Sequence, residues 1–74
     1  MNLRDYYNSV KVRIIDNKRR YIDLAELARQ SDVPYMRIYQ YFGIGMNNLD
    51  EWEIAGIKQV LDEHDTGVNP YEWK

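Results

Sequence analysis

Apolar residues recur at helical spacing near the middle of the chain, over residues 23–29. One face of this segment carries a stripe that consists of Leu24, Leu27 and Ala28. Asp23 is followed three positions later by Glu26, which is the spacing of the capping box that begins many helices. The pattern therefore predicts a short helix with one buried face.

A second helical pattern covers residues 34–42, after a polar turn at residues 30–32. Pro34 suits the first helical turn, because its missing N–H would have no partner there. The residues predicted to face the core are Ile38, Tyr41 and Phe42. The opposite side carries Met36, Tyr39, Gln40 and Gly43, with Tyr35 and Arg37 on its flanks. The spacing thus predicts a helix-turn-helix whose second helix has an exposed outer face.

Three positions of this motif, Ala28, Val33 and Ile38, match the small residue, the turn hydrophobe and the buried hydrophobe of bacterial and phage helix-turn-helix repressors. The segment VPYMRIYQYF resembles the recognition helix of tetracycline-repressor-type proteins, although the chain is too short for their ligand-binding domain. From residue 3 to about residue 63 the chain resembles small lambda-repressor-like domains of the Cro and phage-repressor (XRE) type. Asp32 stands where these domains commonly have the turn glycine.

The expected fold is all-α: a compact bundle of four to five short helices with a central helix-turn-helix. A length of 74 residues fits one domain near the lower limit for a self-sufficient core. We expect residues 1–63 to form the DNA-binding domain. Residues 64–74 are expected to be a C-terminal tail that docks on the core or contacts a second subunit.

The N-terminal segment supports two interpretations. Helical spacing is shown by Leu3, Tyr7, Val10 and Ile14. This stripe predicts a helix over residues 3–16. Residues 10–14 also alternate like a strand, and a turn at Asp16-Asn17 would allow a hairpin that pairs residues 10–15 with 20–22. We favour the helix, because the stripe begins near the N-terminus and an isolated hairpin is marginally stable.

A further helix is predicted over residues 49–62. Gly43 is expected to end the preceding helix, and Asn48 with Glu51 repeats the capping-box spacing. The new helix has a broad apolar arc that consists of Leu49, Trp52, Ile54, Ala55, Gly56, Ile57, Val60 and Leu61. The arc predicts burial, with a second contact surface as the alternative.

The charge is divided between the two halves of the chain. Residues 1–42 carry eight Lys or Arg against five Asp or Glu, whereas residues 43–74 carry two against seven. The half that holds the motif is therefore basic, although the chain as a whole has a net charge of −2. The densest basic run, Lys18, Arg19 and Arg20, is expected to be a loop before the first motif helix. Its cations would bind phosphates there.

We expect the chain to be a sequence-specific regulator of transcription that reads the major groove of double-stranded DNA with residues 34–42. Arg37 can reach a phosphate or a guanine edge, and Gln40 can make a two-pronged contact with adenine. Tyr39 has a hydroxyl for a phosphate and a ring for a thymine methyl. The candidate DNA-binding residues are Tyr35, Met36, Arg37, Tyr39, Gln40, Lys18, Arg19 and Arg20.

Other functions have less support. There is no cysteine and His64 is the single histidine, so no catalytic set, metal site or cofactor site is expected. The position of His64 suggests a solvated residue. A solvated helix face is also expected for the acidic residues Glu51, Glu53, Asp62, Glu63 and Asp65. No apolar run approaches the length of a membrane span, and we expect a cytoplasmic protein.

Two kinds of partner are expected. A homodimer, at least on DNA, would add phosphate contacts that one short motif lacks. The alternative function is a protein-interaction module of the same fold. Its contact surface would be the acidic C-terminal half, with Trp52, Tyr71 and Trp73.

Overall fold

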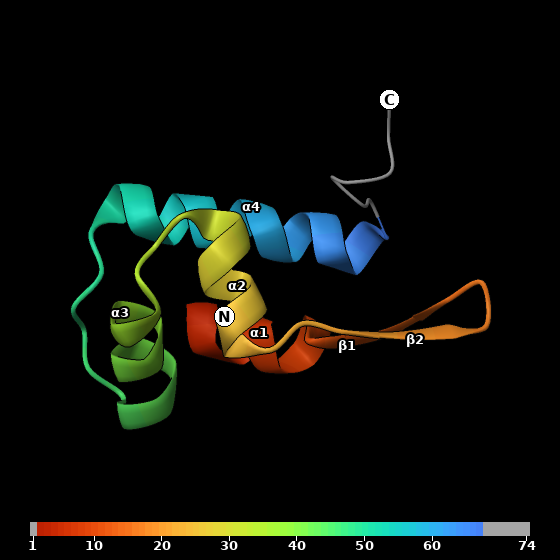
Figure 1. The fold of residues 1–74 in the computed structure, drawn as a ribbon, viewed down its shortest axis with the longest axis horizontal. Helices are drawn as coiled ribbons and strands as arrows, with labels where there is room; N and C mark the ends of the chain where they lie inside the picture. Colours follow the sequence, from red (N-terminus) through yellow and green to blue (C-terminus); the bar gives the residue numbers. More distant parts are fainter. Residues whose placement is uncertain (1, 68–74) are drawn as a thin grey trace.

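The structure is a computed structural model, and it describes residues 2–67. Figure 1 shows the elements in chain order: α1 (Leu3–Val10), β1 (Val12–Ile15), β2 (Lys18–Tyr21), α2 (Leu24–Ser31), α3 (Tyr35–Tyr39), the π-helical segment η1 (Gln40–Ile44) and α4 (Glu51–Thr66). The described chain is mostly helical and contains one two-stranded antiparallel sheet. The expectation of a purely all-α fold was therefore wrong in this respect.

The sheet is a β-hairpin between α1 and α2. Helix α1 ends at Val10, so the predicted helix over residues 3–16 was wrong beyond that residue. The alternative hairpin is present, but it pairs residues 12–15 with 18–21 and not 10–15 with 20–22. Asp16 and Asn17 form its two-residue turn, with φ angles of 55° and 63°. Both angles are positive, as in the type I′ turns that match the twist of paired strands, and Asp and Asn tolerate them well. Ile14 is 74% exposed on β1, so the last member of the helical stripe does not join the core.

The four helices enclose one hydrophobic core. Its fully buried residues come from α2, α3 and α4, and they are Leu27, Ile38, Ile57 and Leu61. Helix α1 adds Leu3, Tyr7 and Val10. In Figure 1, α4 runs along the length of the molecule above α1 and α2. Burial of these side chains holds α2 and α3 in a fixed relation to the rest of the chain.

Helix α4 begins two residues later than predicted and extends four residues further. Its capping box joins Asp50 and Glu53, with the Glu53 Oε1 accepting from the Asp50 N–H at 2.9 Å, so the predicted pair of Asn48 and Glu51 was wrong. The helix continues to Thr66, through residues assigned above to the tail.

The apolar arc of α4 is only partly buried. Ile57, Val60 and Leu61 face the core as expected, but Trp52 is 66% exposed and contributes to the surface. Tyr71 and Trp73, the tail aromatics expected to dock or to bind a second subunit, lie outside the described residues. Among residues 2–67, no helix combines the length and the apolar character that crossing a membrane requires.

Candidate nucleic-acid interface

Helices α2 and α3 are joined by a tight turn centred on Asp32. The Asp23 carboxylate accepts a hydrogen bond from the Glu26 N–H at 2.7 Å, as the capping pattern predicted. Asp32 adopts the left-handed conformation (φ 59°, ψ 33°), and its N–H bonds to the Ala28 carbonyl. An aspartate accepts this conformation more readily than most residues, which explains how the turn closes without a glycine.

The second helix buries one face and exposes the other, as its pattern predicted. Ile38 is fully buried and Tyr41 is 7% exposed, while Phe42 packs against the core. The outer face of α3 (Tyr35, Met36 and Tyr39) is 44–63% exposed. The core is complete without these three side chains, so they are available to a partner.

The helix does not stop at Gly43, where we expected its end. Its last turn widens into η1, and the chain leaves the helix at Gly45, which has a φ of 96°. A Cβ at Gly43 would lie 3.1 Å from Cδ1 of Tyr39, so the ring of Tyr39 occupies the space that the missing side chain leaves. The rings of Tyr35 and Tyr39 lie 6.4 Å apart. Gly43 therefore lets Tyr39 lie close along the helix.

Arg37 is bound to other parts of the same chain. Its Nη2 lies 2.9 Å from Oε1 of Glu53, whose side chain is 1% exposed, and it also donates to the carbonyl of Asn48. Glu53 was expected on a solvated helix face, and that expectation was wrong. The pair joins α3 to the start of α4, so Arg37 positions the helix.

Gln40 also makes an internal contact, with one half of its amide. Its Oε1 accepts a hydrogen bond from Nδ2 of Asn48 at 2.9 Å. Its Nε2 has no hydrogen-bond partner in the part of the chain that the structure describes. The amide is thus held by its oxygen and keeps two N–H donors for a partner.

The basic run forms strand β2, whereas the sequence predicted a loop. The three hairpin cations (Lys18, Arg19 and Arg20) make no ion pair with any residue between 2 and 67. Figure 1 shows that the hairpin projects from the end of the molecule opposite to α3. The structure therefore does not bring the two groups of predicted DNA-binding residues together.

Most of the other described cations have partners. Carboxylates pair with Arg13, Arg29, Arg37 and Lys58. Arg4 donates to the carbonyls of Tyr41 and Met46, and its guanidinium lies 4.0 Å from the centre of the Tyr41 ring. Lys11 donates only to the neutral side chain of Asn8, so the hairpin holds three of the five described cations without a carboxylate partner.

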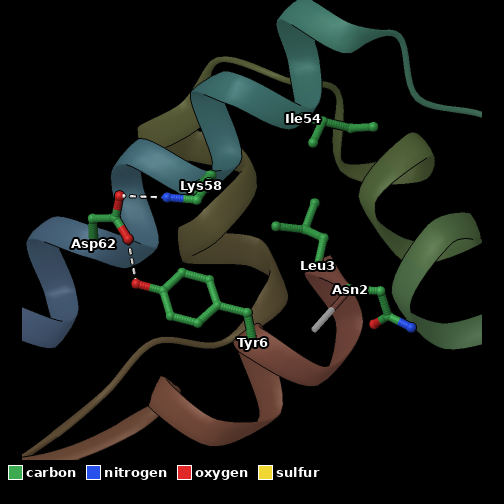
Figure 2. Close-up of a pocket in the computed structure, with 6 residues that line it drawn as sticks. All are labelled: Asn2, Leu3, Tyr6, Ile54, Lys58 and Asp62. Atoms are coloured by element: carbon green, nitrogen blue, oxygen red, sulfur yellow. Dashed lines mark hydrogen bonds and ion pairs between the residues drawn. The ribbon is translucent and has the colours of Figure 1, made fainter.

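A second polar region lies between α1 and α4. It contains a pocket of about 420 Å³, whose lining residues are Asn2, Leu3, Tyr6, Ile54, Lys58 and Asp62 (Figure 2). The Tyr6 hydroxyl donates to one oxygen of Asp62, and Lys58 binds the other at 3.1 Å. These polar groups satisfy one another, so they are not free to orient a small molecule as the polar groups of ligand pockets do.

The hydrogen bond between Tyr6 and Asp62 shifts the pKa values of both side chains. It raises the pKa of Tyr6 to about 12 and, with the Lys58 ammonium, lowers the pKa of Asp62. Burial raises the pKa of Tyr7 on the same helix. Both tyrosines therefore hold their protons more tightly in the folded state than in the unfolded state.

This shift predicts a loss of stability in alkali. An unfolded tyrosine titrates near pH 10, so the contribution of Tyr6 should be complete below about pH 10 and disappear as the pH rises to about 12. Between about pH 9 and about pH 11, the free energy of unfolding measured by chemical denaturation should fall less in Tyr6→Phe than in the wild type. Equal losses in both proteins would contradict the assignment. Asp62 also contributes stability, but with the opposite pH dependence: because its pKa is lowered in the folded state, the contribution should be lost in acid as the carboxylate is protonated.

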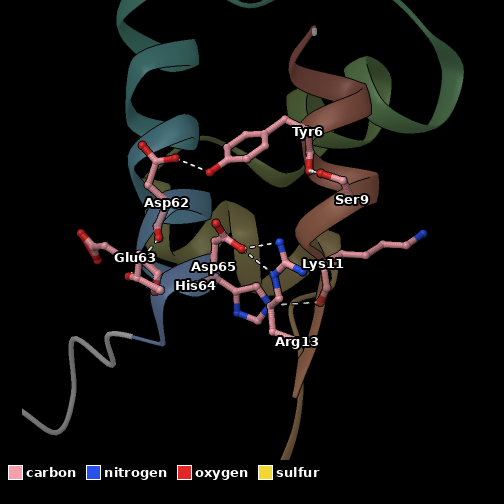
Figure 3. A network of polar contacts seen from close by, with 9 residues as sticks. Tyr6, Ser9, Lys11, Arg13, Asp62, Glu63, His64 and Asp65 are labelled. Atoms are coloured by element: carbon pink, nitrogen blue, oxygen red, sulfur yellow. Dashed lines mark hydrogen bonds and ion pairs between the residues drawn. The ribbon is translucent and has the colours of Figure 1, made fainter. Parts of the chain in front are cut away.

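His64 and Asp65 each contact the segment of residues 11–13, which the sequence did not reveal. Nε2 of His64 lies 3.1 Å from the carbonyl of Lys11, and Asp65 pairs with Arg13 on β1 (Figure 3). His64 was expected to be solvated, yet it lies partly buried against the first strand. No local pattern predicts these contacts, because more than fifty residues separate the partners in the sequence.

Comparisons of the chain with protein-family models, with curated proteins and with solved structures gave no significant match.

Proposed function

We propose that this chain is a sequence-specific DNA-binding regulator that places α3 in the major groove. One observation carries the proposal: α3 follows a tight turn after α2, is fixed by the core and exposes Tyr35, Met36 and Tyr39 to solvent. A helix has the width that the major groove accepts. The resemblance to lambda-repressor-like domains supports the same function. In this proposal the regulator is cytoplasmic and acts by occupying an operator.

Each group on this surface has a chemical role in the proposal. The hydroxyls of Tyr35 and Tyr39 donate to phosphates, while the ring of Tyr39 and the thioether of Met36 contact thymine methyl groups. The Nε2 of Gln40 donates to a base edge, and its orientation is set by Asn48. Arg37 holds α3 against α4 through Glu53, so we assign it a positioning role and no longer a base contact.

The proposed complex contains two chains on a two-fold symmetric operator. Paired recognition helices would then enter grooves about 34 Å apart on one face of the DNA. The exposed Trp52 is the described residue that best fits a contact between subunits, because much of the remaining apolar arc of α4 is buried in its own core.

The test of the α3 surface uses Tyr39. Its side chain is 44% exposed and outside the core, so substitution should leave the fold intact. Tyr39→Ala should weaken binding to the DNA upstream of the chain's own coding sequence by about tenfold or more, since a good base-edge contact is worth about 1–3 kcal/mol. Tyr39→Phe, which loses only the hydroxyl, should lose less. An electrophoretic shift assay at low and moderate salt measures both.

Trp52→Ala is the matched control, because it removes another exposed aromatic that is not part of α3. It should bind a single DNA half-site with unchanged affinity. Wild-type affinity in Tyr39→Ala would exclude the proposed surface.

A second candidate function is a protein-interaction module that uses the acidic C-terminal half. The observation in its favour is Trp52, which is 66% exposed beside the acidic residues that begin α4. A protein partner that is lost with Trp52→Ala but retained with Tyr39→Ala would favour this candidate, provided that the wild-type chain binds no DNA.

A further inference from the structure

The β-hairpin is a rigid projection whose base is fixed to two helices. On one side, the Tyr7 hydroxyl of α1 donates to the carbonyl of Ile22 at 2.9 Å, directly after β2. On the other side, Asp65 of α4 pairs with Arg13, and His64 contacts the carbonyl of Lys11 (Figure 3). With a two-residue type I′ turn at its tip, this arrangement leaves little freedom to its backbone.

The hairpin is also packed against the end of α4. A Cβ at Gly67 would lie 2.8 Å from Cδ1 of Ile15, so the isoleucine lies directly over the glycine. Gly67 also has a φ of 84°, which favours glycine. The direction in which the hairpin points is therefore set by contacts from α4.

Beyond this base, the hairpin presents positive charge on both of its faces. Side chains alternate along a strand, so Lys18 and Arg20 lie on one face and Arg19 on the other. Arg20 pairs across the sheet with Arg13, and the carboxylate of Asp65 neutralises Arg13 at this point. Asp65 thus reduces the repulsion between two like charges without pairing with the hairpin cations.

We propose that the hairpin is a phosphate-binding arm that contacts the DNA backbone beyond the groove that α3 reads, within about one helical turn of it. This proposal rests on the proposed function. Unpaired cations on both faces of a narrow ribbon suit a partner with negative charge on either side of it, as the phosphate strands of DNA provide.

The distance between the groove that α3 reads and the phosphates at the hairpin is limited by the length of the molecule. The structure measures 35 × 24 × 19 Å, and α3 and the hairpin lie toward opposite ends of its long axis (Figure 1). Their separation is therefore less than 35 Å and does not exceed about one turn of B-DNA, which is about 34 Å long. The hairpin cations therefore reach phosphates other than those beside α3, and they add affinity without reading sequence.

The test replaces Lys18, Arg19 and Arg20 together with glutamine, which removes the charge but keeps long polar side chains. The probe is the duplex that the wild-type protein enriches most from a random-sequence pool. Each phosphate contact contributes about 0.9 to the slope of log affinity against log salt. The triple variant should therefore show a slope lower by about 2–3 and an affinity at least about tenfold weaker at about 0.1 M salt, with the same sequence preference.

Two single variants provide a matched comparison that does not depend on the stability of the triple variant. Lys18→Gln removes an unpaired lysine of the hairpin and should lower the slope by about 1. Lys58→Gln removes an exposed lysine of α4 that is paired with Asp62, and it should leave the slope unchanged. A slope that is the same in Lys18→Gln and the wild type would overturn the proposal.

Phosphate ethylation of the probe locates the contacts. Ethylation outside the half-site that α3 reads, within about one turn of it, should weaken the wild type but not the triple variant. If the affected phosphates lie only beside the bases of each half-site, the arm as proposed is excluded. Failure of the wild type to enrich any sequence would refute the proposed function itself. Sequence-specific binding that is insensitive to the hairpin charges would refute only the arm.

Discussion

Arg37→Ala should destabilise the fold by about 3 kcal/mol, because it leaves the carboxylate of Glu53 buried without its cation. Glu53 keeps one hydrogen bond, from the N–H of Asp50, which does not replace a guanidinium. A domain of this size has a total stability of only about 5 kcal/mol, so the variant should keep only about 2 kcal/mol and unfold at a much lower urea concentration. Urea denaturation followed by circular dichroism measures the loss.

Arg29→Ala is the control for this prediction. Arg29 pairs with Glu26 on the surface of α2 and has a side chain that is 57% exposed, so its loss should cost less than about 1 kcal/mol. A double-mutant cycle with Glu53→Gln isolates the pair, and the double variant should lose less than the sum of the two single variants. Equal losses in Arg37→Ala and Arg29→Ala would contradict the structural role of Arg37.

Ile38→Ala should cost about 3 kcal/mol, within the range for a large-to-small substitution at a fully buried position. Met36 lies two residues earlier on α3 and is 63% exposed, so Met36→Ala should change the stability by less than about 0.5 kcal/mol. Thermal unfolding of the two variants compares the inner and outer faces of one helix. Similar losses of stability in both variants would show that α3 does not bury the face that carries Ile38.

The same two variants should separate stability from binding. Met36→Ala should fold normally and bind DNA more weakly, because its thioether belongs to the proposed contact surface. Ile38→Ala should regain normal binding at a temperature low enough for the protein to be folded. Such a reversal distinguishes a residue that touches DNA from one that only supports the helix.

The sequence predicted the α2–turn–α3 unit well because its signals are local. A side-chain cap at Asp23, a turn residue at Asp32 and a stripe that returns every three or four residues all act within a few positions. The burial of Ile38 and the exposure of Tyr39 follow from the same period.

The hairpin was predicted only as the alternative, because two patterns overlap in the same residues. The helical stripe runs through Val10 to Ile14, but the helix ends at Val10, strand pairing begins at Val12, and Ile14 is left exposed. Asp16 and Asn17 were the better signal, since both accept the positive φ angles of a type I′ turn.

The role of Arg37 was not predictable from the sequence. Its partner Glu53 looked like one of several solvated acids on a helix, and nothing local distinguishes it from its neighbours. The pairing depends on how the loop at residues 45–50 places the start of α4 beside α3, and that path is a property of the whole fold. The same reason explains why the contacts of Asp65 and His64 with the hairpin were missed.

The central claim is that α3 reads DNA sequence, and selection of bound duplexes from a random-sequence pool tests it most directly. The wild-type protein should enrich one motif, and Tyr39→Ala should enrich it less or with altered bases at the contacted positions. A bound pool with the same sequence composition as the starting pool, obtained with folded wild-type protein at low salt, would contradict the claim.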